Sequence, residues 1–378
     1  LMRILLVGGA VRDHVLGRPP GDKDFLVLDA DAAAFQERFP DARLVGREFP
    51  VFWLDGRQYA LPRGGDVMAD LAARDLTINA MALDEDGTVI AHPEALKDIE
   101  ARVLRPASPT ALADDPVRVF RAARFAALLP DFAPAPELLE RMAAAAEAGL
   151  LDGCIAERVG QEVRKALGGP APGRFPRLLA DTGCLAPWLR ELDDCRGVPA
   201  GPPEHHDGDV LEHTAEVMDR LAAASASPLL CWMGLCHDLG KALTPPGRHP
   251  AHHGHEALGA APARTLAKRL RLPEAWARAG ELAAEEHMRA ARYPELRPGT
   301  RVDLLTRLDA AGLAAECFAL ARADHGRDHA SAALADLETI RAVRLPEHLR
   351  DLGPESGERL RMLRAEALAG KGRERSGL

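Results

Sequence analysis

Two aspartates close to the N-terminus have the residue types and the spacing for metal-dependent chemistry. Asp22 and Asp24 stand at the entrance of the apolar run 25–28, which predicts a buried strand. Because alternate residues of a strand point to one face, the two carboxylates would converge while Lys23 faces away. Two convergent carboxylates are what a pair of Mg²⁺ ions needs for nucleotidyl transfer. The pair therefore predicts a catalytic two-metal site.

A pair of glycines one helix earlier supplies a candidate phosphate cradle. The apolar run 4–7 predicts a strand, and Gly8 and Gly9 allow a tight turn into a helix over 11–16. Backbone N–H groups at such a turn approach a phosphate closely, and the helix N-terminus adds the positive end of its dipole. Each motif alone is usually an ordinary turn or a solvated loop. Their combination favours a nucleotide site.

At these motifs and at residues 74–80 the sequence resembles the bacterial-type tRNA nucleotidyltransferases, the CCA-adding family, whose relatives include bacterial poly(A) polymerases. The resemblance implies that Asp22 and Asp24 are catalytic and bind Mg²⁺. It also implies that the nucleotide is bound by Gly8, Gly9, Arg12, Asp13, Arg74, Asp75 and Asn79. The family usually has two arginines before the aspartate of the second motif. Here Ala73 precedes Arg74, so any role of the first arginine is lost.

A predicted helix that begins at 114–116 carries an acid and three arginines on one broad face. Its start combines an acidic cap with a proline, and Arg118, Arg121 and Arg124 recur at every third residue. Cytosine and adenine each present an amino donor beside a ring-nitrogen acceptor, so an Asp beside an Arg would accept C and A and reject U and G. The resemblance gives this template role to Asp115 and Arg118, with Arg121 and Arg124 near the triphosphate or base.

The second half of the chain carries a different chemistry. His213, the adjacent His237 and Asp238, and Asp324 reproduce the H…HD…D pattern of HD-domain metal-dependent phosphohydrolases. Further candidate ligands are His252, His253, His255 and His287. Mixed imidazole and carboxylate ligands suit octahedral divalent ions such as Ni²⁺, Mn²⁺ or Mg²⁺ rather than a tetrahedral structural zinc. Water bound to such an ion could attack a phosphoester.

The predicted fold class is α+β, with a small mixed-sheet head followed by an all-α neck, body and HD domain. The predicted parts are a nucleotidyltransferase head (1–105), a helical neck and RNA-binding region (106–200), the HD domain (201–330) and a helical tail (331–378). Strands are expected at 4–7, 25–29, 51–54, 57–61, 80–84 and 88–91, with a helix over 29–39 and a hairpin turn at 55–56.

Composition limits the class of protein and its partners. The formal net charge of −9 argues against nonspecific coating of nucleic acid but is compatible with a local basic groove. The six cysteines form no C-x-x-C pair, so we expect reduced core thiols of a cytoplasmic protein, also at Cys231 and Cys236. No signal peptide or membrane span is expected. The resemblance implies tRNA and CTP as partners, with ATP and the oligomeric state left open.

Only ten residues, 64–73, separate Arg63 from Arg74. Many complete CCA-adding enzymes have a longer basic loop here, thought to reshape the pocket from C to A, and members without it tend to add only CC. We therefore expect addition of two C residues. The alternatives are complete CCA addition and polyadenylation within the same class. Outside it stand an HD phosphohydrolase with an RNA-binding head and a catalytically silent tRNA-binding module.

Overall fold

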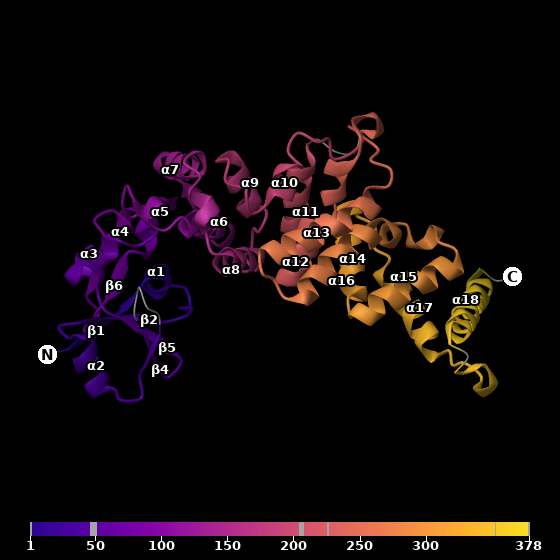
Figure 1. Ribbon diagram of the computed structural model, residues 1–378, viewed down its shortest axis with the longest axis horizontal. Coiled ribbons are helices and arrows are strands. Elements are labelled where there is room, and N and C mark those ends of the chain that lie inside the picture. The colour runs from indigo at the N-terminus through magenta and orange to yellow at the C-terminus, as the bar shows by residue number, and fades with distance from the viewer. Residues whose placement is uncertain (1, 46–50, 204–207, 225–226, 352, 377–378) are drawn as a thin grey trace. The chain divides into compact units, whose positions relative to one another are not determined.

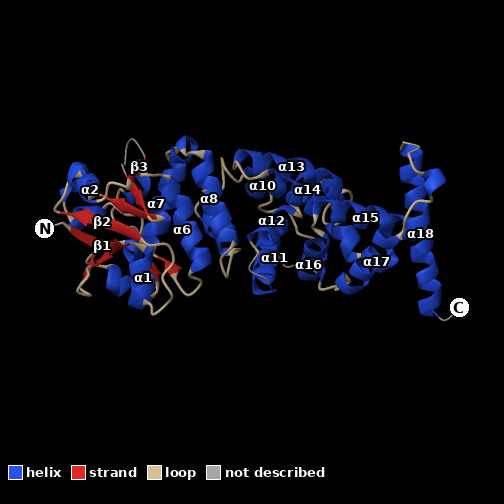
Figure 2. Cartoon of the chain, turned by 90° about the horizontal axis from the view of Figure 1, so that it is seen from below, coloured by secondary structure: helices blue, strands red, loops and turns tan. Residues whose placement is uncertain are grey.

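The computed structural model describes residues 2–45, 51–203, 208–224, 227–351 and 353–376, which form two compact units. Unit 1 comprises Leu1–Ile155 and Asp181–Cys184, and unit 2 comprises Ala156–Ala180 and Leu185–Leu378. Among the described residues the strands lie in unit 1, and unit 2 is helical (Figure 1, Figure 2). The predicted α+β class is confirmed. The predicted division into four parts stays a prediction.

Unit 1 is built on a seven-stranded mixed sheet with the order β3-β4-β5-β2-β1-β6-β7. Its strands are β1 (Arg3–Val7), β2 (Asp24–Leu28), β3 (Arg43–Val45), β4 (Val51–Leu54), β5 (Arg57–Ala60), β6 (Met81–Leu83) and β7 (Val89–Ala91). β2 pairs antiparallel with β1 and parallel with β5. Asp24 therefore lies between Val7 on one neighbouring strand and Gln58 on the other.

The apolar strands of unit 1 are buried on both faces of this sheet. Leu26 and Leu28 of β2 pack in one cluster with residues of β1 and β6, whereas Val27 between them packs on the other face against Phe35 and Phe52. A sheet covered on both sides needs nearly continuous apolar strands, which explains the uninterrupted run in β2.

Unit 1 also contains helices. They are α1 (Gly9–Val15), α2 (Ala32–Arg38), η1 (Arg63–Gly65), α3 (Val67–Ala72), η2 (Thr77–Asn79), α4 (Ala95–Ala101), α5 (Ala111–Asp114), α6 (Val117–Leu128), α7 (Pro136–Glu147) and η3 (Leu150–Gly153). Two further short strands, β8 (Val103–Leu104) and β9 (Ala133–Pro134), pair in parallel and form a separate small sheet.

The structure agrees with one local prediction, shifts a second by two residues and contains one strand that was not predicted. The hairpin turn at 55–56 is confirmed, since Asp55 and Gly56 both have positive φ, 49° and 73°, as a type I′ turn requires. The helix expected from 11 begins two residues earlier, at Gly9. β3 was not predicted, because Leu44 and Val45 are exposed at the sheet edge and show no alternation with buried residues.

The described secondary-structure elements of unit 2 are helices. They are α8 (Ala156–Leu167), α9 (Arg174–Asp181), α10 (Arg190–Asp193), α11 (Val210–Ala224), α12 (Pro228–Cys236), η4 (Leu239–Leu243), η5 (Pro246–Arg248), α13 (His255–Arg269), α14 (Glu274–Ala291), η6 (Tyr293–Glu295), α15 (Pro298–Ala311), α16 (Ala314–His325), α17 (Ala330–Ala342), η7 (Glu347–Leu349) and α18 (Pro354–Ser376). α18 packs on α15 and α17.

The six cysteines are free, and five of them are buried. Burial raises the pKa of the Cys231 thiol to about 12, which agrees with a core position. A search of the described helices finds none that is long and apolar enough to cross a membrane.

Candidate functional site

The turn between β1 and α1 takes a backbone conformation that favours glycine. Gly8 has φ 76° and ψ −137°, and its carbonyl accepts the N–H groups of Val11 (3.1 Å) and Arg12 (3.2 Å). A Cβ atom on Gly8 would lie 2.9 Å from Nη1 of Arg74. The glycine therefore allows the guanidinium of the second motif to lie directly over the first motif.

A buried polar chain joins the two motifs to α6. Arg12 donates to Asn79 Oδ1 (2.7 Å) and to Asp13 Oδ1 (2.7 Å), and Asn79 donates to Asp75 Oδ1 (3.1 Å). Arg121 donates from Nε to Asp75 Oδ2 at 2.9 Å. Burial raises the pKa of Asp75, but the Arg121 charge and the hydrogen bonds outweigh it and hold that pKa below its ordinary value. Hydrogen bonds thus connect five of the predicted nucleotide residues with one another.

A pocket of about 430 Å³ opens at the N-terminal end of β2. Val7, Asp24, Phe25, Leu26, Val51, Gln58, Ala60, Leu61, Pro62, Arg63, Asp70 and Arg74 line it. Its apolar walls and few polar groups are typical of a small-molecule site. The structure therefore brings the predicted metal ligand Asp24 and the predicted nucleotide ligand Arg74 to one cavity.

The two aspartates of the predicted metal pair differ in their local structure. Asp24 is the first residue of β2, whereas Asp22 lies in the bend before it, so the strand alternation expected for the pair does not extend to Asp22. Both residues are exposed. Exposed carboxylates with room for water suit Mg²⁺, which usually takes one or two carboxylates and keeps several waters.

Sequence reasoning missed three polar residues of this pocket: Gln58, Arg63 and Asp70. Asp70 is buried, and both its oxygens accept hydrogen bonds from arginines. The sequence did contain a signal for the pair of Asp70 with Arg74, because an aspartate and an arginine four residues apart can form an ion pair at one helical turn. Arg63 gave no comparable signal, since its place at the pocket depends on how the chain turns after β5.

The predicted template helix is interrupted at its acid. α5 ends at Asp114, Asp115 is extended (φ −147°, ψ 92°), and α6 begins at Val117. The expectation of one helix carrying Asp115 was wrong, because a residue before proline disfavours the helical conformation. The Asp115 carboxylate still lies 3.9 Å from Arg118 Nε.

The three arginines of α6 make different contacts. Arg118 is buried and donates to the carbonyls of Ala73 (2.7 Å) and Ala111 (2.9 Å), while Arg121 binds Asp75. The guanidinium carbon of Arg124 lies 4.1 Å from the centroid of the Phe125 ring, and that of Arg12 lies 5.2 Å from the same centroid. The Phe125 ring thus connects α6 to the Arg12 side chain of α1.

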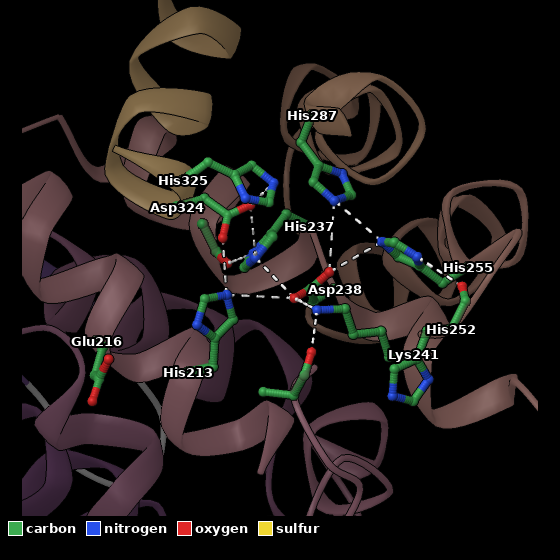
Figure 3. A network of polar contacts seen from close by, with 12 residues as sticks. His213, Glu216, His237, Asp238, Lys241, His252, His255, His287, Asp324 and His325 are labelled. Carbon is green, nitrogen blue, oxygen red and sulfur yellow. Dashed lines mark hydrogen bonds and ion pairs between the residues drawn. The ribbon is translucent and has the colours of Figure 1, made fainter. Parts of the chain in front are cut away.

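A second site, in unit 2, gathers side chains from five segments of the chain (Figure 3). His213 (α11), His237 and Asp324 (α16) form one group of candidate metal ligands, and Asp238, His255 (α13) and His287 (α14) form another. His213 Nε2 lies 2.9 Å from Asp324 Oδ1, and His255 Nε2 lies 3.2 Å from His287 Nε2. His237 and Asp238 directly follow α12.

Asp238, a member of the second group, also lies close to two histidines of the first. Its Oδ2 lies 3.1 Å from His237 Nε2 and 3.6 Å from His213 Nε2, and its Oδ1 lies 3.3 Å from His255 Nε2 and 3.6 Å from His287 Nε2. Lys241 adds an ion pair, with its Nζ 2.7 Å from Oδ2. Lys241 was not predicted, although its spacing from Asp238 fits one helical turn. The two oxygens of this carboxylate therefore lie close to both groups of candidate metal ligands.

The donor atoms at this site fit a divalent ion. His237 Nε2 and both Asp238 oxygens are buried without a hydrogen bond of good geometry. Burial lowers the pKa of His237, but the negative charges of Asp238 and Asp324 raise it to about 9; the same charges favour a metal cation, which would replace the proton on this ring. Burial lowers the pKa of His287 to about 3, so this imidazole is neutral and can donate its lone pair to a metal. A cation would satisfy the converging lone pairs.

Two neighbouring histidines do not join this cluster. His253, a predicted ligand, is exposed and belongs to neither group of candidate ligands among the described residues. His252 is buried, but its ring nitrogens lie 2.6 Å from Thr244 Oγ1 and 2.7 Å from the Pro199 carbonyl. It connects the segment before α11 to the loop before α13.

Three stretches of the chain match models of known protein families. Residues 4–55 match the model of the poly A polymerase head domain, residues 131–196 that of the probable RNA and SrmB-binding site of polymerase A, and residues 210–325 that of the HD domain. The fold and sites therefore define a nucleotidyltransferase head joined to an HD domain.

Relatives narrow this class to one family. The chain is 40% identical to the multifunctional CCA proteins of Xanthomonas campestris pv. campestris (strain B100) and Stenotrophomonas maltophilia (strain R551-3), covering 97% of this chain and 98% and 99% of the two relatives. The chain belongs to the bacterial CCA-adding enzyme family.

Solved structures agree with the fold. One is titled as a CCA-adding enzyme of Bacillus stearothermophilus in complex with CTP, with a TM-score of 0.67, 24% identity and coverage of 98% of this chain and 89% of that one. Another is titled as a Thermotoga maritima CCA-adding enzyme complexed with tRNA, with a TM-score of 0.67, 19% identity and coverage of 98% and 88%.

Proposed function

We propose that unit 1 adds C residues to the 3′ end of tRNA from CTP, with two Mg²⁺ ions at Asp22 and Asp24. The observation that carries this proposal is the 430 Å³ pocket in which Asp24 and Arg74 meet. The similar structures described above, one in complex with CTP and one with tRNA, support these substrates. The ions would activate the attacking hydroxyl and neutralise the leaving diphosphate.

The protein's own residues bind and orient the nucleotide. Arg12 and Arg74 hold phosphate oxygens beside the Gly8 turn. Asn79 fixes the direction of the Arg12 guanidinium, and Asp75 in turn holds Asn79. This arrangement is independent of the base, so base selection needs other groups.

Asp115 and Arg118 read the base edge in this proposal. A cytosine accepts a hydrogen bond at N3 and donates one from N4, so it matches one Arg and one Asp. Arg118 donates to backbone carbonyls in this structure, and reading a base exchanges at least one of these bonds for a bond to the base. A base with the reversed edge leaves buried groups unpaired, which is strongly unfavourable.

Addition stops after two C residues in this proposal. The ten residues between Arg63 and Arg74 are occupied by η1, the cap residue Asp66 and α3, which ends at Ala72. Little chain is left for a mobile loop that could reshape the pocket for adenine.

The test uses tRNA that ends at the discriminator base and each labelled nucleoside triphosphate. CTP should add two residues, and ATP should not extend the product. Efficient addition of A to tRNA ending in CC would establish complete CCA addition instead, and long A tails would establish polyadenylation. Absence of any addition would overturn the proposal in favour of the RNA-binding alternatives.

Unit 2 is proposed to be a metal-dependent phosphohydrolase. The shared carboxylate of Asp238 carries this second function, because it offers an oxygen to each of two groups of buried ligands. His213, His237, Asp238 and Asp324 would hold one divalent ion such as Ni²⁺, Mn²⁺ or Mg²⁺, and His255 and His287 would complete a second position. Hydrolysis of 2′,3′-cyclic phosphates or simple phosphomonoesters tests it, with metal content measured in parallel.

A further inference from the structure

One buried carboxylate holds two arginines at the nucleotide pocket. Oδ1 of Asp70 accepts hydrogen bonds from the backbone N–H (3.2 Å) and the Nε (3.1 Å) of Arg63. Oδ2 accepts from the Nε (3.2 Å) and Nη2 (3.0 Å) of Arg74. The Asp70 side chain is only 3% exposed. Both arginines are therefore fixed through their Nε edges.

The remaining guanidinium nitrogens are available to a ligand. Nη1 of Arg74 lies over the Gly8 turn. Within the described part of the chain, the terminal nitrogens of Arg63 have no protein partner, and 38% of the Arg63 side chain is exposed. Asp24, Arg63 and Arg74 line the same cavity. A ligand in it meets two cations and a metal-binding carboxylate together.

We propose that Arg63 binds the phosphates of the nucleoside triphosphate together with Arg74, and that Asp70 is the positioning residue that presents both guanidinium groups. This inference rests on the proposed nucleotidyltransferase function of unit 1. The second motif of this chain has Ala73 where the family usually has a first arginine. Arg63 would supply a phosphate contact in addition to that of Arg74. The planar guanidinium suits this task, because its fork matches phosphate oxygens.

The charge arrangement explains why a carboxylate stands between two phosphate-binding groups. Asp70 neutralises one of the two positive charges, so the arginines can lie close together before the nucleotide arrives. It also fixes both side chains, which lowers the conformational entropy lost on binding. Because the carboxylate uses the Nε edges, it leaves terminal nitrogens for the ligand.

The first test replaces Arg63. Arg63→Ala should raise the KM for CTP about tenfold or more, because a charge-assisted hydrogen bond is lost, and should leave the KM for tRNA unchanged. Arg57→Ala is the matched control, since Arg57 is exposed on β5 and does not line the pocket. An unchanged KM for CTP in Arg63→Ala would overturn the inference.

The second test separates positioning from folding. Asp70→Asn keeps the shape of the side chain but loses its charge, and it should raise the KM for CTP more than it lowers kcat. Adding Arg63→Ala to Asp70→Asn should then have a smaller effect than Arg63→Ala alone, because Arg63 is no longer held. A role in folding alone would lower the melting temperature and leave the two substitutions additive in KM.

Equilibrium binding keeps this inference distinct from the proposed function. CTP binding with Mg²⁺ is measured on the full chain for the wild type and for Arg63→Ala. If the wild type adds no nucleotide yet Arg63→Ala weakens CTP binding, the proposed reaction fails and the inference stands. If the wild type adds C and Arg63→Ala binds CTP normally, the inference fails alone.

Discussion

Replacement of Gly8 by alanine should damage the nucleotide site more than the fold. A side chain at φ 76° is strained, by roughly 1–3 kcal/mol. The new Cβ would also lie 2.9 Å from Arg74 Nη1, so the guanidinium must move away from the turn. Loss of one charge-assisted phosphate contact lowers kcat/KM for CTP by about tenfold or more.

Gly17 provides the matched control for this substitution. It also has positive φ, 66°, but a Cβ there would have no atom within 4 Å. Gly17→Ala should therefore cost about 1 kcal/mol in the free energy of unfolding, from backbone strain alone, and should leave kcat/KM for CTP near that of the wild type.

The assays are urea unfolding and incorporation of labelled CTP into tRNA that lacks its tail. Both variants should unfold at lower urea concentration than the wild type, and only Gly8→Ala should lose incorporation beyond its loss of folded protein. Equal incorporation by the two variants, after correction for the folded fraction, would refute the placement of Arg74 over the turn.

Four further substitutions test the remaining roles. Asp24→Ala or Asp22→Ala should abolish C addition while CD spectra and tRNA binding stay close to wild type, and near-normal addition by both would remove the two-metal proposal. Arg118→Ala should lower CTP use and weaken rejection of UTP, measured as the ratio of their kcat/KM values; an unchanged ratio contradicts the template role. His237→Ala should eliminate phosphoester hydrolysis and reduce bound metal yet spare C addition, and a wild type that binds no divalent ion in unit 2 would contradict the metal centre.

Much of the head could be predicted because its signals are local. The apolar run of β2 and the Asp55–Gly56 turn each depend on neighbouring residues, and both are present as expected. Asp115 shows where such reasoning failed. The signal placed the start of α6 within two residues, but the cap residue is Pro116 rather than an acid, and the proline holds Asp115 in an extended conformation outside α6.

Residues that meet only through tertiary structure were harder to find. His237 and Asp238 are adjacent in sequence, so a motif identifies them. The division of the six candidate ligands into two groups depends instead on the packing of α11, α13, α14 and α16. His252 and His253 have similar sequence surroundings. Only burial and hydrogen bonds show that His252 supports the loop and that His253 faces solvent.

The short segment after β5 accounts for both the form of the pocket and the proposed stop after two C residues. Gly64 has φ 75°, and a Cβ there would lie 2.7 Å from Ala69 Cβ, so the turn closes directly onto α3. Asp66 caps that helix by accepting the N–H of Ala69 at 2.8 Å.

This closure places Asp70 within reach of both the backbone and the side chain of Arg63. A longer insertion would have to pay an additional loop-closure entropy to bring the same groups together. The short segment instead gives the pocket a fixed wall in which Arg63 and Arg74 are already positioned. In the proposal this wall contacts only the phosphates, so the stop after two C residues follows from the short segment itself, which leaves little chain for a loop that could reshape the pocket for adenine.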